Sequence, residues 1–209
     1  MASRRAGAPG RGELELPLFP LKTVLYPGGL LPLRIFEQRY IAMAKACLQD
    51  SRPFGVCLIT RGDEVAHDPT APPEFSMVGT EATIASWDMP ELGILHVRAV
   101  GGERFQVRSH RVERDGLVVA LAARIPAEPT ATLETRFEPL AKLLELIAAR
   151  VGPHQFPEAR AYDDASWVGY RLAEVLPLPL SIKQGMLEIN DSDVRLALLQ
   201  KFLQQQGLV

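Results

Sequence analysis

The chain has 209 residues, of which 47% are hydrophobic and 23% charged, and its formal net charge at pH 7 is -2. This composition is ordinary for a globular protein, and the weak negative charge gives no electrostatic reason to expect nucleic acid as a partner. The two cysteines, Cys47 and Cys57, do not indicate a disulfide framework, and no apolar run is long enough to predict a membrane span.

The first twelve residues, MASRRAGAPGRG, are rich in Gly, Ala and Arg and show no apolar periodicity. Such a composition predicts a disordered tail over residues 1–12. Arg4 and Arg5 resemble the start of an export signal, but the following ELELPLFPLK alternates charges and prolines where a signal needs an apolar region. We therefore expect a cytoplasmic protein that has no contact with a membrane.

Residues 13–35 predict two strands separated by a turn. Over residues 13–18, Leu and Glu alternate, which is the period of a half-buried strand. Residues 27–29 read Pro-Gly-Gly and predict a turn, after which residues 31–35 repeat the alternation.

A helix is predicted to follow the second strand, because Phe36, Tyr40, Met43 and Cys47 recur at helical spacing on one face. The short apolar run 54–59 then predicts a buried strand. The polar segment 61–75 that follows holds three prolines and predicts a long loop, whose role the sequence leaves open.

Residues 78–125 show a meander of strands separated by turn residues. The dipeptides at 101–102 (Gly-Gly) and 115–116 (Asp-Gly) are typical of tight hairpin turns, which need positive φ angles. We expect residues 13–125 to form one mainly antiparallel, barrel-like domain with a single helix, a shape that hides strand edges.

The period changes to that of helices beyond the proline-containing segment 126–129, and residues 130–209 predict a small helical bundle. Pro139 is expected to kink the first helix or to mark its start. A second helix is expected around residues 167–176. Ser181 and Gln184 match a capping box for a third, and Asn190 or Asp191 is expected to cap a fourth that ends near Gln205.

Residues 16–40, LPLFPLKTVLYPGGLLPLRIFEQRY, resemble the amino-terminal domain of the Lon protease family. Similar pieces continue along the chain at FGVCLI (54–59), VGTEATI (78–84), GERFQV (102–107) and KQGMLEINDSDVRLALLQKFL (183–203). The resemblance implies an α+β fold: a mainly antiparallel pseudo-barrel of the PUA-like, Lon amino-terminal type with one helix, followed by a helical bundle. It also implies a role in substrate recognition.

The patterns that support catalysis in proteins are not found in this sequence. Its glycine pairs are followed by no nucleotide-binding motif, and the ATPase and Ser/Lys peptidase modules of full-length Lon are missing from it. Ser181 lies near Lys183, but at a helix start its hydroxyl is expected to cap the helix. His and Cys residues lack the spacing of a zinc site, and Asp63, Glu64, His67 and Asp68 are interpreted as a solvated loop, with a divalent-ion site as the alternative. No enzyme activity, cofactor or metal is predicted.

The candidate binding site lies at the Pro-Gly-Gly turn, because the apolar residues beside it cannot all face one core. An exposed apolar rim at such a turn is suited to hold an unfolded peptide, which would add to a strand edge. Glu37, Arg39 and Arg104 have a structural alternative, as charges that pair at a corner of the fold. The predicted peptide-binding residues are Tyr26, Leu30, Leu31, Arg34, Glu37 and Arg39.

The leading hypothesis is a non-enzymatic module that binds unfolded or apolar polypeptide segments. A protease or chaperone is considered as a further partner, and the sequence leaves open whether a protease receives the bound segment. An RNA-binding module is the alternative, because the Lon amino-terminal barrel is similar in fold to barrels of RNA-modifying proteins. The arginines of the meander would then supply the basic surface (Arg98, Arg104, Arg108, Arg111 and Arg114). A homodimer and an enzyme with a small-molecule pocket between barrel and bundle are further alternatives.

Overall fold

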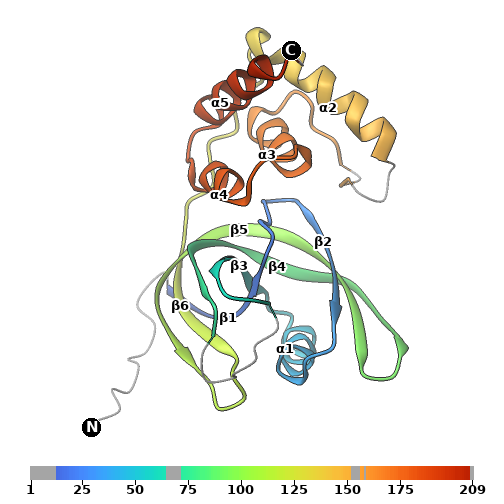
Figure 1. Cartoon of the computed structure of the whole chain (residues 1–209), viewed down its shortest axis with the longest axis vertical. Coiled ribbons are helices and arrows are strands. Elements are labelled where there is room, and N and C mark those ends of the chain that lie inside the picture. Colours follow the sequence, from blue (N-terminus) through green and yellow to red (C-terminus); the bar gives the residue numbers. More distant parts are fainter. Residues whose placement is uncertain (1–12, 65–71, 152–155, 158, 208–209) are drawn as a thin grey trace.

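The computed structural model describes residues 13–64, 72–151, 156–157 and 159–207. The strands and the first helix form one lobe and the remaining helices form a second lobe stacked on it (Figure 1). The strands are β1 (Glu13–Leu21), β2 (Leu30–Ile35), β3 (Phe54–Arg61), β4 (Glu74–Glu91), β5 (Ile94–Val112) and β6 (Val118–Arg124). The helices are α1 (Gln38–Gln49), α2 (Glu138–Val151), α3 (Ala165–Val175), α4 (Leu180–Glu188) and α5 (Ser192–Gln205), with a 3-10 turn at Thr135–Phe137.

The six strands form one sheet in the order β2-β5-β4-β3-β1-β6, and β5 pairs with β6 as well. Only β1 and β3 pair in parallel; the other neighbours are antiparallel. The long strand β5 pairs with β2 through its first half and with β6 through its second half. The sheet therefore curls into a pseudo-barrel, which confirms the predicted α+β class.

The predicted helix after β2 is confirmed in position, but its apolar face begins later than expected. Tyr40, Met43 and Cys47 are buried against the sheet, whereas Phe36 precedes the helix and is 53% exposed. The carbonyl of Glu37 accepts the first helical hydrogen bonds, from the N–H groups of Tyr40 and Ile41. The assignment of Phe36 to the buried stripe was therefore wrong.

The Gly101-Gly102 pair is not a hairpin turn, because β5 continues through it. A side chain at Gly101 would collide with the carbonyl of Tyr26, and Gly28 and Gly101 are joined by a backbone hydrogen bond of 2.8 Å. The glycine therefore permits another segment to approach the strand closely. The Asp115-Gly116 turn is confirmed, with Gly116 at φ 84°.

The helices of the bundle confirm some of the predicted boundaries and correct others. Pro139 lies in the first turn of α2, where a missing N–H costs no hydrogen bond, and Asp191 caps α5 by accepting from the N–H groups of Asp193 and Val194. The capping box is wrong: α4 begins at Leu180 after Pro179, with no side-chain cap. The tail 1–12, the centre of the 61–75 loop and Gly152-Pro153 lie outside the described residues.

A hydrophobic core joins the two lobes. The bundle's buried cluster contains Leu144, Leu172 and Leu199 from its helices, and it also takes in Val24 and Tyr26 from the segment between β1 and β2. Two further clusters fill the barrel and the space between the sheet and α1. Since burial of apolar area stabilises at about 25 cal/mol per Å², this shared core holds the lobes together.

Candidate binding groove

The turn that was predicted to form an exposed rim is instead partly enclosed between barrel and bundle: Tyr26 and Gly29 are buried, Pro27 is half-buried and Gly28 is exposed. The Tyr26 side chain is 0% exposed, and its hydroxyl donates to the carbonyl of Lys183 over 2.8 Å. Arg171, also 0% exposed, donates to the carbonyl of Pro27 over 2.8 Å. The prediction that Tyr26 lies on the rim is wrong, because helices far along the sequence cover it.

A hollow lies beside this turn, along β2. It has a volume of about 510 Å³ and is open to solvent. Its lining includes five consecutive residues of β2, Leu30–Arg34, and residues 23–25 of the segment before β2. Phe19, Leu21 and Phe36 add apolar surface, while Glu174 and Lys183 border it from the bundle. We call this hollow the β2 groove.

Four of the six predicted site residues line the β2 groove: Leu30, Leu31, Arg34 and Glu37. Tyr26 and Arg39 do not. The Arg39 side chain is buried, donates to the carbonyl of Gly116 over 3.1 Å, and pairs with Glu37 at 2.8 Å. Arg39 thus fixes the corner between β2 and α1, which is the structural alternative considered for it.

The charged residues of the groove each contact another group of this chain, either a charged side chain or a backbone group. Arg34 pairs with Glu91 at 3.4 Å, and Glu64 accepts from the backbone N–H of Lys22 over 2.5 Å. At the bundle side, Glu174 pairs with Arg171 at 3.0 Å, and Lys183 donates to the backbone carbonyl of Glu174 over 2.7 Å.

Burial raises the pKa of the Glu174 carboxyl, although Arg171 and Lys183 act against this, and burial lowers the pKa of Lys183. The groove is thus lined by three acidic and two basic side chains, each of which contacts another group of this chain.

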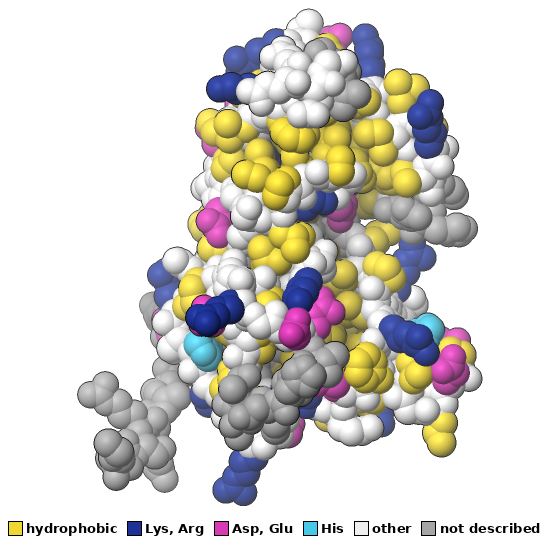
Figure 2. All heavy atoms as spheres, in the orientation of Figure 1, with side chains coloured by type: hydrophobic (Ala, Val, Ile, Leu, Met, Phe, Trp, Pro, Cys, Tyr) yellow, Lys and Arg dark blue, Asp and Glu magenta, His cyan; other side chains and the backbone are white. Residues whose placement is uncertain are grey.

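Most of the other groove residues were not predicted as site residues, among them Phe36, Glu174 and Lys183. Phe36 carried a signal: it lies next to the strand, two positions before the first residue of α1, and need not share the helix face. Glu174 and Lys183 carried none, because only the docking of the bundle brings them to β2. Figure 2 shows apolar side chains mixed with charges of both signs where the lobes meet.

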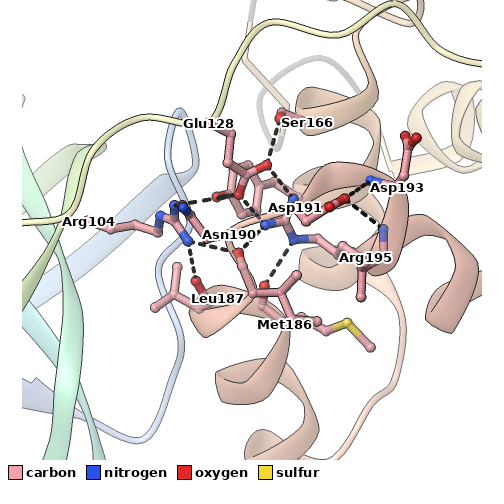
Figure 3. Close-up of polar contacts among 12 residues, drawn as sticks. Arg104, Glu128, Ser166, Met186, Leu187, Asn190, Asp191, Asp193 and Arg195 are labelled. Carbon is pink, nitrogen blue, oxygen red and sulfur yellow. Dashed lines mark hydrogen bonds and ion pairs between the residues drawn. The ribbon is translucent and has the colours of Figure 1, made fainter.

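A buried ionic network lies on the other side of the turn (Figure 3). Glu128 is on the segment that links the lobes, and its side chain, which is 4% exposed, lies between Arg104 of β5 and Arg195 of α5. Arg195 makes a bidentate contact with it, and Arg104 lies 3.6 Å away. The hydroxyls of Ser166 and Tyr170 donate to the same carboxylate over 2.7 and 2.5 Å.

Arg104 also binds the end of α4, since it donates to the carbonyls of Leu187 and Ile189, each over 2.9 Å. The network therefore joins barrel, linker and bundle, in agreement with the structural role considered for Arg104. A second hollow of about 340 Å³ lies above it, lined by Trp167 and by Gly28 of the turn.

Two of the five meander arginines are engaged within the chain. Arg104 is 3% exposed and uses its N–H donors in hydrogen bonds to the bundle. Arg111 pairs with Glu15 at 2.5 Å and with Glu113 at 2.8 Å. Paired guanidinium groups attract phosphates weakly, so these two positions give little support to RNA binding. Arg98, Arg108 and Arg114 are exposed.

Two geometric findings concern metals and membranes. Within the part of the chain that the structure describes, no three His, Cys, Asp or Glu side chains gather as metal ligands. His67 and Asp68 of the acidic loop lie outside that part. No described helix is long and apolar enough to cross a bilayer.

The family is shown by a model of the substrate-binding domain of ATP-dependent protease La (LON), which matches residues 15–205. The chain belongs to this family. Lon protease of Phenylobacterium zucineum is 30% identical over 90% of the chain, and protein cereblon of Danio rerio is 31% identical over 57% of it. These matches cover 24% and 28% of the two relatives, so the chain spans about a quarter of their length.

Solved structures agree with this assignment. The crystal structure of a Lon N-terminal domain protein from Xanthomonas campestris has a TM-score of 0.74 and 34% identity, and the alignment covers 90% of this chain and 98% of that one. The N-terminal domain of Lon protease from the Mycobacterium avium complex has a TM-score of 0.59 at 16% identity, covering 89% and 96% respectively, and shows the shared fold.

Proposed function

We propose that this protein acts by binding rather than by chemistry of its own, and that it holds unfolded or apolar segments of other proteins in the β2 groove. Membership of the Lon substrate-binding family supports a protein ligand. The matches to Lon proteases suggest that the held protein is passed to a protease.

The observation that carries the proposal is the open apolar groove with an exposed aromatic at its rim. Phe36 is 53% exposed, although solvent-exposed Phe is unfavourable without a partner to cover it. Leu30, Leu31 and Leu33 continue the apolar surface from Phe36 along β2. Aromatic residues in such positions commonly supply much of the binding energy of an interface.

A direct test compares Phe36→Ala with Trp87→Ala in titrations with a denatured, labelled polypeptide. Both side chains are exposed, by 53% and 57%, but Trp87 lies on the β4–β5 hairpin outside the β2 groove. We expect Phe36→Ala to weaken binding by about 2 kcal/mol, roughly 30-fold, and Trp87→Ala to leave it unchanged. Equal effects of the two variants, or no binding by the unaltered protein, would contradict the proposal.

A further inference from the structure

The β2 groove runs along the edge of a strand rather than across the face of a sheet. Successive side chains of a strand point to opposite faces, so a groove on one face is lined by alternate residues. Here Leu30, Leu31, Pro32, Leu33 and Arg34 all line it. Among the described strands, β2 pairs only with β5, so its other edge is the one that faces the groove.

The turn before β2 determines which residues of the strand direct their backbone N–H and C=O groups toward β5 and which direct them toward the free edge. The N–H of Gly101 donates to the carbonyl of Gly29 over 2.8 Å, and Leu30 stands opposite Val100 in the next position. In an antiparallel pair, bonded and non-bonded positions alternate. Leu31, Leu33 and Ile35 therefore direct their backbone groups at β5, whereas residues 30, 32 and 34 direct theirs into the groove.

Pro32 is consistent with this alternation, because it stands at a position whose backbone nitrogen faces the groove. A proline has no N–H to donate, so within a sheet it is tolerated where its nitrogen faces away from the neighbouring strand. The free edge thus offers the carbonyls of Leu30, Pro32 and Arg34 and the N–H groups of Leu30 and Arg34. This set of hydrogen-bonding groups matches another extended backbone.

The charged residues and the apolar lining of the β2 groove restrict which peptide can bind there. Glu37, Glu64 and Glu174 are each engaged by a group of this chain, as are Arg34 and Lys183. A charged side chain of a ligand would lose its hydration without gaining a free counter-ion. The apolar wall around Phe19 and Phe36 favours uncharged apolar side chains at every second position.

We propose that the ligand of the β2 groove is an uncharged, extended polypeptide segment that joins the sheet as an additional strand on β2. This inference rests on the proposed function and specifies its ligand. β2 has six residues, so the segment pairs over about six residues, with apolar side chains in alternation facing the groove. A proline that removes a paired N–H of the segment prevents the addition.

The ligand side is tested with an uncharged peptide of alternating Val and Thr, and with two versions of it that carry N-methyl groups on alternate residues, in opposite phases. N-methylation removes a donor but keeps the side chains. We expect the peptide to bind and one phase to lose about tenfold or more in affinity, while the other binds like the parent.

If both N-methylated phases bind as well as the parent, strand addition is wrong. If denatured polypeptide binds but the Val-Thr peptide does not, the inferred ligand is wrong and the proposed function stands. If neither binds, the proposed function itself fails.

The protein side is tested with Arg34→Pro against Arg34→Ala. Both remove the exposed pair with Glu91, but only proline removes the N–H that faces the groove, at a position that donates nothing to β5. We expect Arg34→Pro to bind the peptide about tenfold more weakly than Arg34→Ala, with similar thermal unfolding of the two. Equal affinities would overturn the inference.

A second copy of the chain is the competing occupant, through pairing of two β2 strands. Sedimentation equilibrium over a range of protein concentrations tests this. A dimer that the peptide dissociates would overturn the choice of ligand. A monomer, with peptide affinity that is insensitive to added salt, is the expected result for an uncharged segment.

Discussion

Barrel and bundle meet at two places that use similar residues in opposite ways. At the Tyr26–Gly29 turn, the apolar and polar groups of both lobes are packed together, and the turn is held by Arg171 and Lys183. At the β2 groove, which begins one residue later, Leu30 is half-buried and Phe36 is exposed to solvent. Apolar character alone therefore does not identify a binding surface. What distinguishes the two places is whether another element covers the residues and satisfies their backbone.

The largest effect is expected from Glu128→Ala, which disrupts the buried ionic network that joins barrel and bundle. The substitution leaves Arg104 and Arg195, 3% and 0% exposed, without their shared carboxylate. Loss of one partner from a buried pair costs about 3–5 kcal/mol, which we expect as the decrease in the free energy of unfolding in urea. Glu103→Ala is the control, because Glu103 pairs with Arg124 at the surface and contributes at most about 1 kcal/mol. Similar losses in both variants would show that the network does not join the lobes.

The second test removes the close approach of the turn to β5. A methyl group at Gly101 would collide with the carbonyl of Tyr26, so Gly101→Ala must displace the turn or the strand. We expect a loss of about 1–3 kcal/mol in the free energy of unfolding.

Gly102→Ala is its matched control, because the nearest atom to the added methyl is 3.5 Å away, which is an ordinary contact. Calorimetry of both variants measures the difference. If Gly101→Ala and Gly102→Ala unfold at the same temperature, the turn is not packed as described.

The smallest effect concerns pH. Burial alone would raise the pKa of Glu128, but hydrogen bonds from Arg195, Tyr170 and Ser166 outweigh burial and hold the pKa below its ordinary value. A lowered pKa contributes stability that is present above the ordinary Glu pKa of about 4.3 and is lost as the pH falls through the lower value in the folded state. We expect the unaltered protein to lose stability more steeply than Glu128→Gln below about pH 4. Parallel profiles of urea midpoint against pH would refute this.

Local features of the fold were predictable where the chemistry is local. The Asp115-Gly116 turn and the Asp191 cap depend on a few adjacent residues, and both are confirmed. The Gly101-Gly102 pair was misinterpreted because a glycine pair serves either a turn or a close backbone approach. Only the position of Tyr26, 75 residues earlier in the chain, decides between them.

The site was predictable in part for the same reason. The alternation over 31–35 indicated a strand, and four residues of this region do line the groove. Tyr26 was wrongly predicted to lie on the exposed rim, because no residue near it in sequence indicates that Tyr170 and Lys183 cover it. Whether a peptide occupies the groove stays a prediction.

The insertion of the turn into the bundle also determines how the molecule moves. A single linker, residues 125–134, follows the last strand and would by itself act as a hinge. The hydrogen bonds from Arg171 to Pro27, from Tyr26 to Lys183 and from Arg104 to the end of α4 attach the bundle to other parts of the barrel. Attachments at separate points restrict bending about the linker, so we expect the lobes to rotate through solvent as one particle, with a single correlation time in NMR relaxation.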